Sequence, residues 1–330
     1  MSACAEPLLD VRDLTTEFVV QRGGALAILR PADGVSFRIG RGETLGLVGE
    51  SGSGKSITAL SIIRMVPGPG RITGGTVMFE GRDLATLDEN GLRRVRGARI
   101  GFVFQEPASA LNPVFTIGDQ IAEAIVVHGI APRAVAASQA VELLEAVRIP
   151  DPARCASDYP HQLSGGMRQR AVIAAAIACG PALLIADEPT TALDAKTQAG
   201  ILDLLADMRA RLGLSLLLIT HDLSVVARVA DRIAVMYAGR IVEEGAARDV
   251  LAAPGHPYTR GLLASRPGGV PGSRLQAVPG TVPDLAALPP GCAFVPRCAE
   301  RLEECGARRP GVTTVADGHV VRCFLHGGRA

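Results

Sequence analysis

Residues 49–56 have the sequence GESGSGKS, in which closely spaced glycines precede a lysine and a serine. They follow the apolar run TLGLVG and precede the apolar run ITALSIIRM, so a strand, a loop and a helix are expected in that order. In such a loop the glycines let backbone N–H groups wrap nucleotide phosphates, Lys55 neutralises their charge and the Ser56 hydroxyl ligates Mg²⁺. This context disfavours a chance glycine-rich turn. The residues expected to contact the nucleotide are Gly49, Glu50, Ser51, Gly52, Ser53, Gly54, Lys55, Ser56 and Ile57.

The basic residues are strongly biased toward arginine. Only Lys55 and Lys196 are lysines among 34 basic residues. A lysine kept at position 55 indicates a place where a compact ammonium fits and a guanidinium does not.

Polar residues end three other apolar runs that are typical of buried strands. In LLIADEP the apolar residues are followed by Asp187 and Glu188. In LLLITHD the apolar residues and Thr220 are followed by His221, and in FVFQEP the apolar residues are followed by Gln105. Strand ends of an open α/β sheet meet at the edge where ligands bind, so all four residues are candidates for one site. Asp187 would hold the Mg²⁺ shell and Glu188 would orient or deprotonate the attacking water. His221 would contact the γ-phosphate, and Gln105 would reach metal or water; helix capping by the acids and a structural histidine are the simpler alternatives.

A second anion-binding device lies about a hundred residues further on, in the sequence LSGGMRQR at 163–170. Ser164, Gly165 and Gly166 directly precede an alanine-rich helical stretch, whose N-terminus can bind an anion through oriented N–H groups. Because this segment lies in a predicted helical insertion, we expect it to serve a nucleotide held by another chain. Two subunits packed head to tail would then enclose two ATP molecules.

The remaining pattern predicts an α/β fold with a parallel sheet core. Residues 8–48 and the hairpin at 74–84 predict a partly antiparallel N-terminal β subdomain, and residues 106–180 a helical subdomain. The run TQAGILDLLADMRARLG, which ends at a glycine, predicts a helix between two buried strands. Residues 265–291 are rich in proline and glycine and predict a linker before a short cysteine-bearing extension.

Composition narrows the class of protein. The length of 330 residues suggests two domains, and 48% hydrophobic residues suffice for a sizeable core. A net charge of +1 with interleaved acids and bases argues against a general polyanion binder, so no nucleic-acid partner is expected. No secretory signal or bilayer-spanning run is apparent, which predicts a protein kept in the cytosol.

Together these motifs resemble the ATP-binding subunit of an ABC transporter, over about residues 8–250. The resemblance assigns the family signature to Leu163–Met167, the Q-loop to Gln105, the D-loop to Asp194 in TTALDAKT and the switch histidine to His221. It also implies an aromatic residue that stacks on adenine, for which Phe18 is the candidate, the alternative being a packed strand residue. An ATP-binding domain over 1–254 and an extension over 255–330 follow.

Several features resemble the branch of this family that imports di- and oligopeptides or nickel. They are Met167 in the signature, FQEPASALNP, HQLSGGMRQR, and GHPYTRGLLAS with the tail after it. The resemblance implies an ATPase at the cytoplasmic face of the membrane, working with a second and often different ATPase subunit. Two permeases, docked at 106–180, and an external substrate-binding protein complete such importers. A soluble ABC ATPase acting on nucleic acid or ribosomes, and a regulator with an inactive site, are the rival interpretations.

The C-terminal extension carries four cysteines, separated by five, six and seventeen residues: Cys292, Cys298, Cys305 and Cys323. A short tail with few apolar residues suggests that a metal centre folds it. Zinc sites favour closer cysteine pairs, and some members of the peptide branch carry an iron–sulfur cluster here. A [4Fe–4S] cluster, zinc and free thiols remain open; Cys4, Cys155 and Cys179 are expected to be ordinary thiols.

Overall fold

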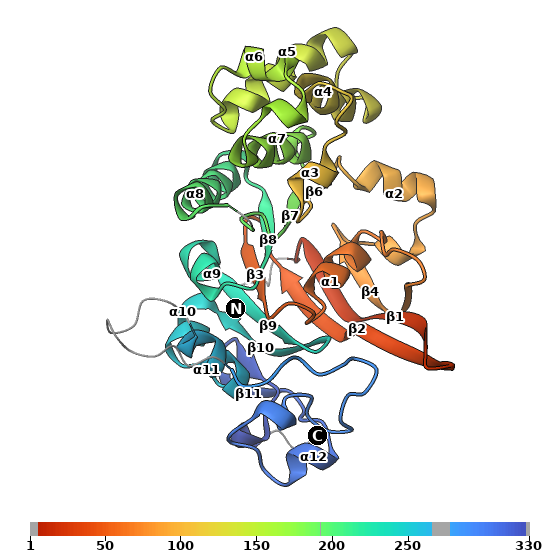
Figure 1. Ribbon diagram of the computed structural model, residues 1–330, viewed down its shortest axis with the longest axis vertical. Coiled ribbons are helices and arrows are strands. Elements are labelled where there is room, and N and C mark those ends of the chain that lie inside the picture. The colour runs from red at the N-terminus through yellow and green to blue at the C-terminus, as the bar shows by residue number, and fades with distance from the viewer. Residues whose placement is uncertain (1–5, 192, 266–277, 328–330) are drawn as a thin grey trace. The chain divides into compact units, whose positions relative to one another are not determined.

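The computed structural model describes residues 6–191, 193–265 and 278–327. The chain divides into two compact units (Figure 1). The first unit comprises Met1–Ile39, Thr44–Ala85 and Leu218–Ala330, and the second Gly40–Glu43 and Thr86–Leu217. Strand β8 (Ser215–Thr220) contributes residues to both units.

An antiparallel sheet in the order β2-β1-β4-β5 forms the N-terminal part of the first unit. Its strands are β1 (Leu9–Arg22), β2 (Ala25–Ile39), β4 (Arg71–Phe79) and β5 (Arg82–Asp83). The pairing of β1 with β2 runs from Leu9 opposite Ile39 to Arg22 opposite Ala25. Strands β4 and β5 form a hairpin, which confirms the antiparallel subdomain predicted from residues 8–48 and 74–84.

A second sheet of the same unit contains the strand that leads into the phosphate loop. Strand β3 (Thr44–Val48) is buried along its whole length and runs parallel to β9 (Arg232–Tyr237). Beyond β9 the order continues with β10 (Arg240–Ala246), β12 (His319–Val321) and β11 (Thr313–Ala316). The C-terminal extension therefore adds two antiparallel strands to the sheet that carries the phosphate loop.

The hydrophobic core of the first unit is shared between strands and helices before residue 254 and the C-terminal extension. Val48, at the end of β3, belongs to the same buried cluster as Tyr237, Tyr258 and Phe294. The helices of this unit are α1 (Lys55–Ile62), α9 (Leu223–Val229), α10 (Ala247–Ala252), α11 (Pro257–Ala264) and α12 (Glu304–Ala307), with 3₁₀ turns η1 (Leu84–Thr86, whose last residue falls in the second unit), η3 (Val295–Arg297) and η4 (Phe324–His326). The tail thus uses the core of the whole unit, so its order has a source other than a metal centre.

The second unit contains two parallel strands and most of the helices of the middle of the chain (Figure 1). Strand β6 (Ile100–Val103) pairs with β7 (Leu183–Asp187), from Ile100 opposite Leu183 to Val103 opposite Ala186. Its helices are α2 (Glu89–Val95), α3 (Pro107–Ala110), α4 (Ile117–Val127), α5 (Arg133–Ala146), α6 (Pro152–Ser157), α7 (Gly165–Ile177) and α8 (Ala195–Leu212), with a 3₁₀ turn η2 (Pro160–Gln162).

Apolar spacing explains why these helices form a bundle. Helix α5 buries Ala136, Ala140 and Leu144, which lie four residues apart and therefore on one face. Helix α8 begins at its cap Asp194 and ends at Gly213, whose φ of 65° suits glycine. The helix between two buried strands is confirmed, as is the predicted α/β class.

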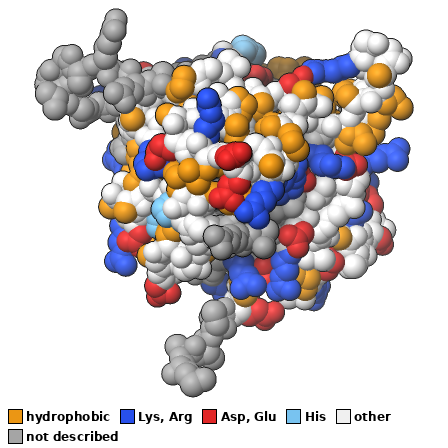
Figure 2. Space-filling model, turned by 90° about the horizontal axis from the view of Figure 1, so that it is seen from below, with side chains coloured by type: hydrophobic (Ala, Val, Ile, Leu, Met, Phe, Trp, Pro, Cys, Tyr) orange, Lys and Arg blue, Asp and Glu red, His pale blue; other side chains and the backbone are white. Residues whose placement is uncertain are grey.

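The described surface carries both acidic and basic side chains (Figure 2), as the interleaved charges of the sequence predict. On the face in Figure 2, basic, acidic and apolar side chains are interspersed. No helix within the described ranges is both long and apolar enough to cross a bilayer. Part of the predicted linker, residues 266–277, lies outside the described residues, and residues 278–291 contain no helix or strand.

Candidate nucleotide-binding site

The phosphate loop lies between β3 and α1 in the first unit, as the sequence predicts. The Lys55 side chain is buried, and its Nζ donates hydrogen bonds to the carbonyl oxygens of Gly49, at 2.8 Å, and Glu50, at 2.9 Å. The Ser53 N–H donates to the Glu50 carbonyl at 3.2 Å, and the Gly239 N–H donates to the Ser53 carbonyl at 2.8 Å. These bonds hold the loop in a compact form with Lys55 at its centre.

Two glycines of the loop are required by its geometry. Gly54 has a φ of 107°, and a Cβ there would lie 1.8 Å from the Pro31 carbonyl oxygen. A Cβ at Gly49 would lie 2.2 Å from the Met236 carbonyl oxygen. Any side chain at either position would therefore push the loop away from the backbone of β2, which contains Pro31, or of β9, which contains Met236.

The same loop has the groups that a phosphate needs. Ser51 and Gly52 are exposed, whereas Ser56 and Ile57 are half-buried on the first turn of α1. Among the described residues, no side chain caps the N-terminus of α1, as expected of a helix start that binds an anion. Within the described residues, the buried Ser53 hydroxyl also has no hydrogen-bond partner, as expected of a group that a ligand satisfies.

Phe18 and His221 also lie in the first unit. Phe18 is half-buried in β1, and its ring packs against Gly70, where an added Cβ would lie 2.5 Å from Phe18 Cζ. His221 is exposed, directly after β8 and before Asp222, the cap of α9. Adenine stacking by Phe18 and phosphate contact by His221 stay predictions.

The second unit holds the acidic residues. Asp187 is the last residue of β7 and is buried, and Glu188 follows it with a φ of 46°. The Thr191 hydroxyl donates to Glu188 Oε2 at 2.8 Å, and Gln105 Nε2 donates to the same oxygen at 3.3 Å. The structure therefore brings Gln105 and Glu188 together and fixes the Glu188 carboxylate through one of its oxygens.

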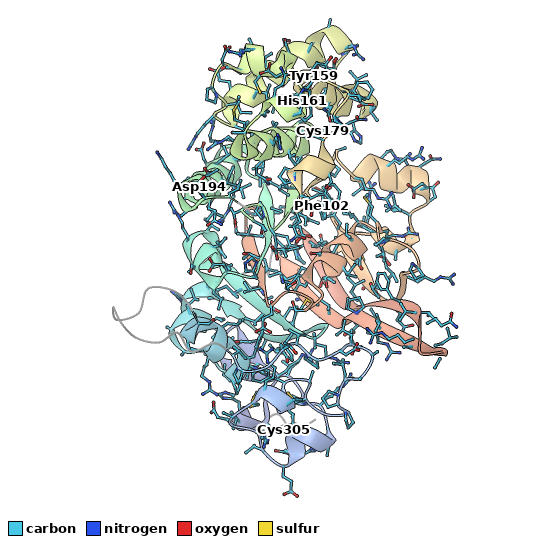
Figure 3. The ribbon with its side chains drawn as sticks, in the orientation of Figure 1. Phe102, Tyr159, His161, Cys179, Asp194 and Cys305 are labelled. Carbon is cyan, nitrogen blue, oxygen red and sulfur yellow. The ribbon has the colours of Figure 1, made fainter. Side chains whose placement is uncertain are left out.

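The signature segment forms the N-terminus of α7. Ser164 caps this helix and accepts a hydrogen bond from the Met167 N–H. The N-terminus of α8 lies beside it: a Cβ on Gly166 would lie 2.8 Å from Thr197 Cγ2, whereas Gly165 has room. Asp194 caps α8 (Figure 3) and accepts from the Thr197 hydroxyl and from the backbone N–H groups of Lys196 and Thr197, bonds that lower the pKa of its carboxyl. Two long helices thus begin next to each other, each with a side-chain cap at its N-terminus.

The four cysteines of the tail gather around one small cavity of the first unit. They are Cys292, Cys298, Cys305, labelled in Figure 3, and Cys323. Burial raises the pKa of the Cys292 and Cys298 thiols, and that of Cys323 to about 11, so without a metal these thiols stay protonated at neutral pH. Within the part of the chain that the structure describes, no three His, Cys, Asp or Glu side chains are arranged as ligands of a metal ion.

Comparison with known proteins decides the family. The family model of the ABC transporter matches residues 32–191, and the model of the oligopeptide/dipeptide transporter C-terminal region matches residues 242–305. A probable peptide ABC transporter ATP-binding protein of Sinorhizobium fredii is 50% identical over 323 residues, which cover 97% of this chain and 95% of that protein. The chain belongs to the ATP-binding proteins of ABC transporters.

Other relatives of this ATP-binding protein agree. The dipeptide transport ATP-binding protein DppD of Bacillus subtilis is 46% identical over 327 residues, 98% of this chain and 96% of its own length. The dimeric cassette MJ0796 in a post-hydrolysis state with ADP and Pi is 30% identical and superposes with a TM-score of 0.64, covering 73% of this chain and 99% of that one. This ATP-binding protein is an ATPase, which confirms the predicted activity.

Sequence reasoning did not identify four residues that hold the site of this ATP-binding protein. Thr191 and Thr197 orient Glu188 and Asp194. Tyr258 and Arg297, in the extension, contact Glu50 of the phosphate loop. The threonines lie three residues after their partners, a spacing that a search for side-chain caps would find. No local sequence pattern indicated that Tyr258 or Arg297 contacts the phosphate loop.

Proposed function

We propose that this protein is the motor subunit of an importer of di- and oligopeptides. The proposal rests on relatives named for peptide transport that match nearly the whole chain, and on the match of its extension to the oligopeptide/dipeptide transporter C-terminal region. A motor subunit does not itself touch the peptide, so the transported substrate is assigned through these relatives.

The observation that carries the motor role is the presence of two anion-binding devices in one chain. The first unit has a phosphate loop, and the second has the Ser164-capped N-terminus of α7. We propose that the segment Ser164–Gly166 covers the nucleotide of a second ATPase subunit, so that two ATP molecules close the pair. Asp194, at the start of the neighbouring helix, would take part in the same interface.

Hydrolysis of ATP requires the protein mainly to position the reacting groups and to neutralise the charge of the phosphates. Lys55 and the loop N–H groups bind the phosphates, and Mg²⁺, held by Ser56, Gln105 and Asp187, would neutralise their charge. Glu188 orients the attacking water, since Thr191 and Gln105 hold its carboxylate. His221 would contact the γ-phosphate, and Phe18 would stack on the adenine.

The proposed partners follow from this role. They are a second ATPase subunit, two permeases and an external substrate-binding protein, with this chain at the cytoplasmic face of the membrane. The helical subdomain of 106–180 is the proposed contact with the permeases.

The test is transport by the assembled complex. We expect proteoliposomes with the permeases, both ATPase subunits and the binding protein to take up labelled di- or oligopeptides only with ATP inside. The same vesicles with Glu188→Gln should bind ATP without uptake. ATP-driven uptake of nickel without peptide uptake would contradict the assigned substrate, and peptide uptake at the normal rate by Glu188→Gln would contradict the role of Glu188.

We propose in addition that the cysteine tetrad binds a metal centre, a [4Fe–4S] cluster before zinc. All four thiols line one cavity, although in the described residues no three of them are arranged as metal ligands, so the thiols would have to draw together around the metal. Bound, such a centre would cross-link the tail. An anaerobic preparation should contain iron and absorb visible light, and Cys305→Ser should lose both signals, whereas Cys179→Ser should keep them. Zinc without iron would assign the tetrad to zinc, and a metal-free, colourless preparation would leave free thiols.

A further inference from the structure

The C-terminal extension contacts the phosphate loop through one buried arginine. Arg297 Nη1 donates to Glu50 Oε2 at 2.6 Å, and Nη2 donates to Glu50 Oε1 at 2.9 Å. The Arg297 side chain is 4% exposed, and that of Glu50 is 26% exposed. A two-point, charge-assisted pair of this kind fixes both distance and orientation.

Arg297 is itself held rigidly by the extension and by β9. Its Nε donates to the Pro279 carbonyl at 2.7 Å, and Nη2 also reaches the Val278 carbonyl at 3.3 Å. The guanidinium carbon lies 5.8 Å from the centre of the Tyr237 ring and 5.9 Å from that of Phe294. Every direction of the guanidinium fork is therefore occupied, and Arg297 presents Glu50 with a fixed partner.

A second residue of the extension holds the backbone of Glu50. The Glu50 N–H donates to the Tyr258 hydroxyl at 2.8 Å. The Tyr258 ring is fully buried, with its centre 4.6 Å from that of Tyr237 and 5.5 Å from that of Phe294. The extension thus fixes Glu50 at its N–H and at its carboxylate.

The fixed residue is the one that supports the nucleotide-binding lysine. The Glu50 carbonyl accepts hydrogen bonds from Lys55 Nζ at 2.9 Å and from the Ser53 N–H at 3.2 Å. Glu50 therefore links the extension on one side to Lys55 and the loop N–H groups on the other. A shift of Glu50 would move the groups that bind the β- and γ-phosphates.

We propose that Arg297 and Tyr258 are positioning residues of the ATPase, which hold the phosphate loop in its nucleotide-binding form through Glu50. The extension then sets the affinity for ATP in addition to completing the fold. Preorganisation of this kind acts on binding, because a loop that is already ordered loses less entropy when ATP arrives. The inference concerns the ATPase site alone and is independent of the transported substrate.

The experiment compares two arginines of the extension in the full-length chain. Arg297→Gln removes the contact to the loop. The matched control Arg309→Gln removes an ion pair of the same extension to Asp33, 3.2 Å long and outside the loop. We expect Arg297→Gln to raise the Kd for Mg-ATP and the KM about tenfold with kcat changed less than twofold, and Arg309→Gln to leave Kd and KM unchanged.

A milder variant separates positioning from folding. Tyr258→Phe removes the hydroxyl that accepts from Glu50 and keeps the buried ring, so we expect a raised Kd with little change in Tm. In the double variant Arg297→Gln/Glu50→Gln the two effects on Kd should be less than additive, because both act through one contact. Kd values at the wild-type level in Arg297→Gln and Tyr258→Phe, with only Tm lowered, would overturn the proposal.

Discussion

Lys55 illustrates how one residue type is selected by the space around it. Its ammonium reaches two backbone carbonyls in a buried loop, at 2.8 Å and 2.9 Å. A planar guanidinium is longer and presents a flat fork, so it cannot make both contacts in the same space. This explains why a chain that otherwise uses arginine has a lysine at this position.

We predict that Lys55→Arg, although it keeps the charge, weakens binding of Mg-ATP at least tenfold. The matched control is Lys196→Arg at an exposed position of α8, which should bind ATP as the wild type does. Equilibrium binding of a fluorescent ATP analogue measures both. Normal affinity in Lys55→Arg would mean that charge alone is required at position 55.

Glu188 shows what the sequence could predict at the residue scale and what it could not. The motif located the acid at a strand end. The positive φ of Glu188 and its bonds to Thr191 and Gln105 depend on the turn after β7 and on a residue 83 positions earlier.

We predict that Thr191→Val lowers kcat severalfold with little change in KM, because it removes a contact that orients the Glu188 carboxylate. Steady-state ATPase assays test this, and a change confined to KM would contradict it.

At the scale of elements, the helix N-termini of the second unit combine two roles. Ser164 accepts from the Met167 N–H, which stabilises α7, and it precedes the two glycines of the proposed nucleotide contact. An N-cap contributes about 1 kcal/mol to stability. A negative charge at the cap is compatible with the helix dipole but repels a phosphate.

We therefore predict that two substitutions of Ser164 differ in their effect on the free energy of unfolding. Ser164→Ala should lower the free energy of unfolding by about 1 kcal/mol, whereas Ser164→Asp should keep it near the wild-type value. Urea unfolding of both variants measures the difference. If Asp proves as destabilising as Ala, the hydroxyl is not acting as a cap.

Helix α11 has a cap that titrates. The buried His256 accepts the Tyr258 N–H through Nδ1, and burial, with nearby Arg260 and His326, lowers its pKa to about 3. Unfolding raises this pKa to its ordinary value of 6.5, so the unfolded chain takes up a proton at pH 5 and the folded chain does not. The stability that the neutral, buried His256 contributes is fully present above pH 6.5 and is lost as the pH falls from 6.5 toward 3.

We predict that this one group costs about 2 kcal/mol of stability between pH 7 and pH 5. His256→Asn keeps an acceptor for the helix cap and removes the titration, so its stability should fall by correspondingly less over the same range. Urea unfolding at pH 7, 6 and 5 gives both slopes. Parallel slopes for the two proteins would contradict the assignment.

The elements also explain how far prediction from the sequence reached. The phosphate loop, the antiparallel strands and α8 are specified by residues that are neighbours in the chain, so their patterns were sufficient. The contact of Arg297 with Glu50 joins residues 247 positions apart, and it depends on a tail that packs on a core shared with β3. The sequence suggested that a metal centre orders this tail, because its own apolar residues are few; the shared core was not visible in any local pattern.

At the scale of the whole molecule, each chain has one phosphate loop and one signature helix, and the two belong to different units. The dimeric cassette to which this chain is similar was observed after hydrolysis, with ADP and Pi. A chain of this design is expected to associate when ATP is bound and to separate after hydrolysis. Trapping the bound state should then require only that hydrolysis be blocked while the two anion-binding devices stay intact.

We predict that Glu188→Gln forms a stable ATP-dependent dimer, either with itself or with its partner ATPase, measurable by size-exclusion chromatography with light scattering. Adding Ser164→Asp should abolish the dimer and leave ATP binding unchanged, because the phosphate loop is untouched and only the segment proposed to face the second chain becomes negative. Adding Arg133→Lys, at an exposed position of α5, serves as the control and should leave the dimer intact. A Glu188→Gln chain that stays monomeric with saturating ATP, alone and with its partner, would contradict the two-chain site; so would a dimer that survives Ser164→Asp.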